Sequence, residues 1–340
     1  MTTGIYALAG PSIVIENLAD QLCKKGVEVT IGALIFKRTP PNGAYSVSTI
    51  PVYNISKLRR FLDNFNIVHN HHPIMNYLDL ISHIPFIYHY HGAPNFGKGN
   101  LFRFSMFSSV KITSHRFDAV IAVSETGNAE LKKFLDPNKM HVIYNGVDTR
   151  LFRPGVEGLF RKGTPQCLFV GNLYDYKKVD EVILAFKKLI KKYPMAHLQI
   201  VGEGAAHAKL KNLVGRLNVQ DSVSFVGVVP HNNLTPYYAS CDVYVTASRC
   251  EQFPLPLLEA WACGKPVVAS SIRSHEELLS ASKAGKIYKV GDVQDLCATI
   301  TAVYEHKDEF KCNALQFAKE HDWSVVADQI TGIYTEILSD

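Results

Sequence analysis

Two glutamates, Glu251 and Glu259, stand with seven residues between them around the start of a predicted helix. Pro256 suits the first position of that helix, because its missing N–H would have no partner there in any case. Glu251 then lies in the loop that enters the helix, and Glu259 lies about one turn inside it. A helix N-terminus offers N–H groups and partial positive charge, which favour a phosphate. Two carboxylates around such an anion site suit a ligand with a diphosphate between two polyols, as in a nucleotide sugar.

A purely structural interpretation of this pair stays open at this point. Glu259 would then complement the helix dipole, and Glu251 would be a solvated loop residue. Other strand-to-helix turns bear on the choice, because ligands of parallel α/β sheets bind beyond the carboxyl ends of the strands. One such turn, 171–180, carries Lys177 close to a helix start, where a cation is disfavoured unless an anion binds nearby.

A second turn contains Gly202, Glu203 and Gly204 after an apolar run. This is half of a dinucleotide-binding fingerprint, with His207 in place of the third small residue, so the motif is weak on its own. The alternative is a tight turn that needs glycine for packing only.

The elements that must position these residues are clearest in the second half. Apolar runs occur at residues 167–170, 198–201, 223–226, 243–246, 266–269 and 287–290. Apolar residues recur at helical spacing over 182–193, which predicts a helix there. Further helices are expected at 205–217 and from Leu255. Strands and helices in alternation predict a parallel sheet with helices on both faces.

The first half repeats this theme with weaker patterns. A helix is expected at Ile13–Lys25, ended by Gly26, and strands at 27–33, 67–69, 86–89, 119–123 and 142–144. Prolines and glycines in 150–165 favour a linker. We therefore expect an N-terminal domain over 1–150, a linker over 151–165, a C-terminal domain over 166–320 and a terminal helix over 321–340.

The block 248–270 resembles the signature of retaining glycosyltransferases of glycosyltransferase family 4. Members usually read Glu-Gly-Phe-Gly-Leu-Pro where this chain reads Glu-Gln-Phe-Pro-Leu-Pro, and the match continues through Leu257-Leu258-Glu259-Ala260. The resemblance covers nearly the whole chain and is strongest over 171–270. It implies an α/β fold of two Rossmann-like domains, the GT-B fold, with a donor cleft between them and the terminal helix packed back on the first domain.

The same resemblance implies roles for the donor-side residues. Glu251 would hold sugar hydroxyls and orient the anomeric carbon, and Glu259 would hold the ribose diol. Lys177 and the helix start at Leu255 would stabilise the departing diphosphate. Further donor-binding positions are Gly171, Asn172, Gly202, Glu203, Gly204, Gly227 and Phe253.

Two positions depart from the family pattern. Asn172 stands where members have an arginine that binds the diphosphate, so half of the usual charge clamp is missing. Pro254 stands where members have a glycine whose backbone N–H holds a sugar hydroxyl, and proline has no N–H.

In the first half, the resemblance assigns a catalytic role to His91, near the transferring sugar. The alternative is a histidine satisfied inside a packed loop. Ser124, Glu125 and Gly10 are expected on the acceptor side. Gly10 stands where the family has a glycine-rich loop. Only Met1, Thr2 and Thr3 precede Gly4, which is too few for the usual opening strand and loop. Either Ile5–Leu8 forms a short strand, or the start of the chain is truncated or rebuilt.

Four histidines at neighbouring strand ends, His71, His72, His89 and His91, allow a metal site in principle. No carboxylate or cysteine lies close to them in sequence, and the resembled family needs no metal there. The sequence therefore predicts neither a metal nor another cofactor. The expected donor substrate is a UDP-, GDP- or ADP-sugar.

Charge and cysteine usage bear on partners and on the compartment. Residues 1–165 carry 18 Lys and Arg against 11 Asp and Glu, a formal charge of +7, which predicts an acidic acceptor or a membrane surface. The basic and apolar stretch 98–116 suits a lipid interface, or a helix with one core face. Seven scattered cysteines without a signal-peptide pattern predict a cytoplasmic protein, in peripheral contact with the membrane in one interpretation.

The favoured function is transfer of a sugar, with retention, from a nucleotide-diphosphate donor to a carbohydrate, lipid-linked or small-molecule acceptor, with no nucleic-acid partner. Two alternatives stay open. A nucleotide-sugar epimerase of the same fold would turn over the donor alone, and a non-catalytic nucleotide-sugar-binding protein would bind without turnover.

Overall fold

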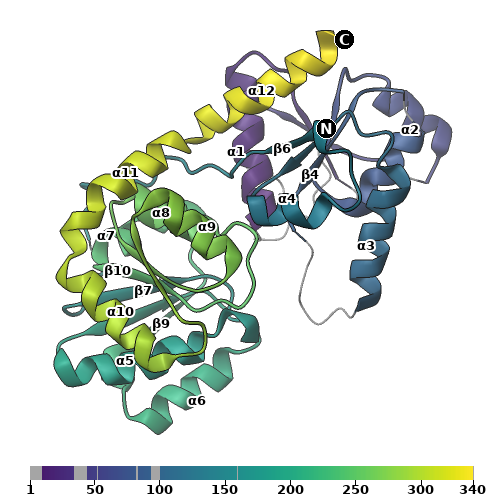
Figure 1. Cartoon of the computed structure of the whole chain (residues 1–340). Helices are drawn as coiled ribbons and strands as arrows, with labels where there is room; N and C mark the ends of the chain where they lie inside the picture. Colours follow the sequence, from purple (N-terminus) through teal and green to yellow (C-terminus); the bar gives the residue numbers. More distant parts are fainter. Residues whose placement is uncertain are drawn as a thin grey trace. The chain divides into compact units, whose positions relative to one another are not determined.

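The computed structural model describes residues 10–33, 44–51, 53–81, 83–92, 100–158 and 160–339 (Figure 1). The chain forms two compact units: Met1–Gly146 with Trp323–Asp340, and Val147–Asp322. Ile5–Leu8, one candidate for the first strand, lies outside the described residues. Each unit is an α/β structure built on parallel strands.

A six-stranded parallel sheet forms the centre of the second unit, in the order β12-β11-β10-β7-β8-β9. Its strands are β7 Gln166–Val170, β8 His197–Val201, β9 Val223–Gly227, β10 Val243–Thr246, β11 Val267–Ser270 and β12 Gly285–Tyr288. β7, β8, β10 and β11 are buried along their whole length. Most of their residues are apolar, because helices cover both faces of the sheet.

The helices of this unit form two packed groups (Figure 1). α5 Val179–Lys192 packs against α6 His207–Leu217 and α10 Val293–Glu305. α8 Leu255–Ala262 packs against α7 Thr235–Ser240 and α11 Lys311–Glu320, and α11 also contacts α9 Arg273–Ser282. The order of the strands reverses between β7 and β10, so the loops after these two neighbouring strands diverge and leave room for a ligand.

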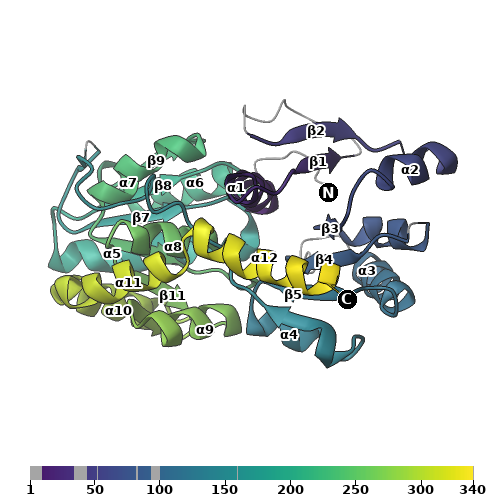
Figure 2. The same ribbon diagram turned by 90° about the horizontal axis from the view of Figure 1, so that it is seen from above.

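The first unit contains a four-stranded parallel sheet in the order β3-β4-β5-β6 and a separate parallel pair, β1-β2. The strands are β1 Thr30–Ala33, β2 Ser46–Thr49, β3 Val68–Asn70, β4 Phe86–Tyr90, β5 Ala119–Ala122 and β6 Met140–Val142. The helices are α1 Gly10–Lys24, α2 Ile55–Leu62, α3 Asn100–Thr113, α4 Glu125–Leu131 and α12 Trp323–Ser339, with a 3₁₀ helix at Pro73–Leu80. The terminal helix α12 packs against α1 (Figure 2).

Several boundaries differ from the sequence-based ones. The strand expected at 287–290 lies at Gly285–Tyr288, the one at 142–144 lies at Met140–Val142, and the one at 27–33 begins only at Thr30. Strand β2 and helix α2 were not predicted, because a four-residue strand and a two-turn helix give little periodicity.

The stretch 151–165, expected to link the domains, is part of the second unit. Phe152 is buried, the Phe160 ring stacks on Tyr237 with centroids 4.3 Å apart, and Arg161 pairs with Asp242 at 2.7 Å. Apolar and charged contacts therefore hold a segment whose prolines and glycines suggested a free linker.

Within the stretch proposed for a lipid interface, Val110 of α3 belongs to the core of the first unit, and Ile112 is exposed. Among the described residues, none of the helices combines the length and the apolar character needed to cross a bilayer.

Candidate functional site

Lys177 and Glu251 form a part-buried ion pair in the second unit. Lys177 ends the 3₁₀ turn Asp175–Lys177 after β7, and Glu251 follows β10. Their strands are the two neighbours at which the strand order reverses. The topology of the sheet therefore brings together the lysine and the first glutamate that the sequence analysis singled out.

A backbone hydrogen bond ties these two loops to each other. The N–H of Arg249 donates to the carbonyl of Tyr176 at 2.8 Å. The Arg249 guanidinium also pairs with Glu181 on α5. Arg249 thus holds the loop after β10 to the loop after β7 and to the first turn of α5, close to the Lys177–Glu251 pair.

Helix α8 begins at Leu255, so Pro256 occupies its second position rather than the first. Pro254 precedes the helix, and its carbonyl accepts the Leu257 N–H at 3.1 Å. Because Pro256 has no N–H, the first turn offers fewer donors to an anion than a standard helix N-terminus. Phe253 and Leu255, both expected to bind the donor, are each 8% exposed.

Glu259 is a buried carboxylate with two protein donors, since only 5% of the residue is exposed. The Tyr238 hydroxyl donates to Oε2 at 2.6 Å, and His231 Nε2 lies 2.9 Å from Oε1. Burial, with the nearby Glu259 charge, raises the pKa of Tyr238 well above its usual value. These contacts rule out a solvated helix-dipole residue. They leave about half of the roughly four acceptor positions of a carboxylate for a ligand.

The expected glycine turns lie against one another at the carboxyl ends of β7 and β8. A Cβ on Gly202 would lie 2.0 Å from the Gly171 carbonyl oxygen, and one on Gly204 would lie 2.4 Å from the Leu173 carbonyl oxygen. Leu173 in turn donates its N–H to the Glu203 carbonyl at 2.9 Å. Gly202 and Gly204 therefore set the close approach of two loops, which is the packing role considered for them.

Three other expected donor-binding positions differ in exposure and contacts. Asn172 is exposed. The Glu203 side chain pairs with His207 at the start of α6. Gly227 ends β9 with a φ of +82°, and a Cβ there would lie 3.6 Å from Glu203 Oε1.

His275 lies fully buried on α9, where the sequence analysis placed no functional residue. Its Nδ1 lies 3.0 Å from the Ser270 carbonyl oxygen, so Nδ1 carries the proton, while the buried Nε2 has no partner. Burial lowers the pKa of His275 to about 4; the Glu251 charge and the hydrogen bond with the Ser270 carbonyl act weakly in the opposite direction, and the Lys177 charge acts weakly in the same direction as burial. A neutral imidazole therefore lies within electrostatic reach of the ion pair.

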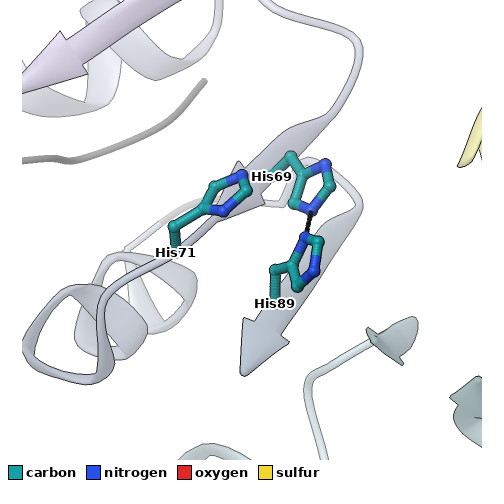
Figure 3. Close-up of side chains that lie close together, drawn as sticks. All are labelled: His69, His71 and His89. Carbon is teal, nitrogen blue, oxygen red and sulfur yellow. Dashed lines mark hydrogen bonds between the residues drawn. The ribbon is translucent and has the colours of Figure 1, made fainter. Parts of the chain in front are cut away.

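In the first unit, four histidines line one face of β3 and β4. His69 and His71 are two residues apart, as are His89 and His91, so each pair points to one side of its strand. His69 Nε2 lies 3.0 Å from His89 Nδ1 (Figure 3), and His71 Nδ1 lies 2.8 Å from His91 Nε2. Burial lowers the pKa of His91 to about 4, and it holds the pKa values of His69, His71 and His89 well below the usual range.

The acceptor-side candidates have local structural roles. Ser124 is the N-cap of α4, and its Oγ accepts the Gly127 N–H at 3.0 Å. Glu125 begins α4 and accepts a hydrogen bond from Asn128 at 3.0 Å. Gly10 is the first residue of α1 rather than part of a loop.

Sequence reasoning missed His231, Tyr238, Arg249, His275 and His69. The donors to Glu259 lie 28 and 21 residues away from it, and no local spacing marks them. His69 could have been found, because a His-x-His pattern repeated on two adjacent strands places four rings on one face.

Two family models match consecutive parts of the chain and together span nearly all of it. "Glycosyltransferase Family 4" matches residues 8–151, and "Glycosyl transferases group 1" matches residues 156–320. The chain belongs to the group 1 glycosyltransferases.

The relatives of this glycosyltransferase include two named bacterial enzymes. D-inositol 3-phosphate glycosyltransferase 2 of Catenulispora acidiphila is 29% identical to this chain. The match covers 66% of this chain and 57% of that enzyme. N-acetyl-alpha-D-glucosaminyl L-malate synthase of Bacillus anthracis is 26% identical, with 98% of this chain and 96% of that enzyme covered.

Solved structures show the same fold. Sucrose-phosphate synthase from Thermosynechococcus elongatus has a TM-score of 0.83 at 19% identity, over 99% of this chain and 98% of that one. HepE from Anabaena, in complex with UDP, has a TM-score of 0.83 at 18% identity, over 98% of each chain. The glycosyltransferase thus has the expected α/β GT-B fold.

Proposed function

We propose that this glycosyltransferase moves a sugar from a nucleoside-diphosphate sugar to a hydroxyl of an acceptor, with retention of the anomeric configuration. The observation that carries the proposal is the Lys177–Glu251 ion pair. It lies where the strand order reverses, and it joins the loops after β7 and β10 beside the start of α8. A cation and a carboxylate placed together suit the two ends of the reacting bond, a diphosphate and a sugar.

In the proposed reaction, the bond between the anomeric carbon and the diphosphate oxygen breaks, and a bond from the acceptor oxygen to that carbon forms on the same face. The acceptor proton passes to the departing phosphate. Lys177 stabilises the negative charge that develops on the diphosphate. Glu251, released from Lys177 as the donor enters, accepts hydrogen bonds from the sugar hydroxyls.

Glu259 is proposed to hold the ribose diol with the acceptor positions that Tyr238 and His231 leave open. The two protein donors fix the carboxylate in one orientation, so that little ordering is needed when the ribose binds. In the first unit, His91 remains the proposed group near the transferring sugar, and Gly10, Ser124 and Glu125 remain proposed on the acceptor side.

We propose UDP as the first nucleotide to test, because HepE was solved with UDP and with UDP-glucose. The basic N-terminal half of the chain favours an anionic acceptor. Two relatives are named for anionic compounds, D-inositol 3-phosphate and L-malate. The alternative is a lipid-linked acceptor, in which case the membrane surface would supply the negative charge that the basic half binds.

Thermal unfolding with UDP, GDP, ADP and their sugar conjugates tests the donor site. A bound nucleotide stabilises the folded chain by about 2.7 kcal/mol at a hundredfold excess over its dissociation constant. We expect one base to raise the midpoint clearly and Lys177→Met to reduce that shift. The absence of a shift with every nucleotide would refute the donor assignment.

The stereochemistry and the two alternatives are tested with the preferred donor. We expect the product to keep the anomeric configuration of the donor by NMR, and inversion would refute retention. An altered sugar formed from the donor alone would indicate an epimerase, and binding without turnover over an acceptor panel would favour a binding protein. Neither alternative gains support from the comparisons, whose matched relatives are named as transferases and synthases.

A further inference from the structure

We propose that His69, His71 and His89 form a binding site for one divalent transition-metal ion, with Zn²⁺ as its probe. One ring nitrogen from each of the three lies within 4.8 Å of the others. All three residues are buried, with 2%, 6% and 2% exposed. Figure 3 shows the three rings gathered at the ends of adjacent strands. The proposal does not depend on the transfer reaction.

The register of the sheet creates this cluster. His69 of β3 pairs with Ile87 of β4, so the position level with His71 is that of His89. Alternate residues of a strand share a face, and the three imidazoles therefore point to the same side of the sheet. His72 is one residue out of phase with His71 and does not belong to the cluster. The ligand set thus differs from the one that the sequence suggested.

Two of the rings already have the second hydrogen-bond partner that metal-binding histidines usually have. His69 Nδ1 lies 2.6 Å from the Tyr334 hydroxyl of α12, which leaves Nε2 for a metal. His71 Nδ1 lies 2.8 Å from His91 Nε2, and His71 Nε2 is buried without a partner. Outer contacts of this kind fix the ring orientation and the tautomer.

His89 supplies the third ligand with a change of tautomer. Its Nδ1 now shares a hydrogen bond of 3.0 Å with His69 Nε2, and its own Nε2 is buried without a partner. A metal between these two nitrogens would replace that hydrogen bond, with the His69 proton on Nδ1 and the His89 proton on Nε2. No proton has to leave the protein. Ligands of a tetrahedral zinc lie roughly 3.3 Å apart, so the pair must open by a few tenths of an ångström.

The donor set selects the class of metal. Three imidazoles without a carboxylate suit zinc, cobalt, nickel or copper, and they do not suit magnesium or calcium, which need oxygen ligands. Three protein ligands would leave a fourth position for water or another ligand. The ion would join β3 to β4 and, through Tyr334, would hold α12 in place.

The test uses the full chain made without a polyhistidine tag and stripped of metal. Titration with Co²⁺ is expected to give the visible absorption of a four-coordinate ion at one equivalent per chain, displaced by Zn²⁺. Zn²⁺ is also expected to raise the unfolding midpoint by mass action. Failure of the wild-type chain to bind Co²⁺ or Zn²⁺ would overturn the proposal and leave a stacked, hydrogen-bonded histidine cluster.

Variants locate the ion. His71→Asn and His89→Asn should lose the cobalt spectrum, and His72→Asn, outside the cluster, should keep it. Because a buried substitution can unfold the unit, Tyr334→Phe provides a second test that keeps the ring packing. Loss of its hydroxyl should weaken binding by about 10- to 100-fold. Unchanged affinity in both Tyr334→Phe and His71→Asn would place the ion elsewhere and refute the site.

Discussion

Lys177 and Glu251 are 74 residues apart in the chain, yet they form an ion pair whose side chains are only 16% and 14% exposed. The pair forms because β7 and β10 are neighbours at the point where the strand order reverses. In the proposed reaction, each of these two charges exchanges its protein partner for a group of the donor.

The first prediction follows from this pair. Glu251→Gln and Lys177→Met should each lower kcat by about 10²- to 10³-fold, because each removes a charge from the reacting centre. The double variant should lose less than the product of the two single losses, since the residues are in contact. Steady-state kinetics measure both effects.

The control for this prediction is Lys209→Met. Lys209 pairs with Asp175 at 3.0 Å, but both side chains are largely exposed, so its loss should leave turnover nearly unchanged. Full activity in folded Glu251→Gln would contradict the proposed role of Glu251.

The second prediction concerns the hydrogen bond from Tyr238 to Glu259. Tyr238→Phe leaves one oxygen of a buried carboxylate without its donor, which should lower the free energy of unfolding by about 2 kcal/mol. Tyr237→Phe, in the same helix, is the matched control and should change it by less than about 0.5 kcal/mol. Denaturant unfolding measures both values. Equal stability of the two variants would show that the contact with Glu259 contributes nothing.

The third prediction tests the close approach of the two glycine turns. Gly202→Ala places a Cβ 2.0 Å from the Gly171 carbonyl oxygen at a φ of +128°. It should destabilise the second unit by about 2–4 kcal/mol. Gly215→Ala, inside α6 with nothing within 4 Å, should stabilise it by up to about 1 kcal/mol. A tolerated Gly202→Ala would mean that the two loops can separate at little cost.

The fourth prediction is a dependence of stability on pH from His275. Its pKa is about 4 in the folded chain and about 6.5 in the unfolded chain, so the unfolded state binds more protons between these values. Stability is therefore complete above about pH 6.5 and falls as the pH drops toward 4. From about pH 7 to pH 5 the loss from this group is about 2 kcal/mol.

His275→Asn isolates this contribution, because asparagine keeps an N–H near the Ser270 carbonyl but does not titrate. The variant should lose less stability than the wild type over the same pH range. Glu251 and Lys177 both act on His275, so the comparison is repeated in Glu251→Gln. Identical pH dependence in wild type and His275→Asn would refute the prediction.

The sheet of the second unit was predictable because its strands are buried on both faces. Runs such as Leu198–Val201 need no context to be recognised, whereas β12 was misplaced by two residues, since most of it is only partly buried. In the first unit, the exposed β2 gave no periodic pattern. Pattern recognition therefore succeeded where burial was uniform and failed at the edges.

By itself, the sequence determined the alternating α/β architecture and the family, and it singled out Glu251, Glu259 and Lys177 as candidates, because each inference rests on local spacing. Only the tertiary structure decided which side chains meet. Tyr238 and His231 hold Glu259, Arg249 ties two loops together, and the register of β3 and β4 gathers the histidines. Such contacts join residues far apart in the chain, and the order and register of strands, which no local pattern encodes, fix them.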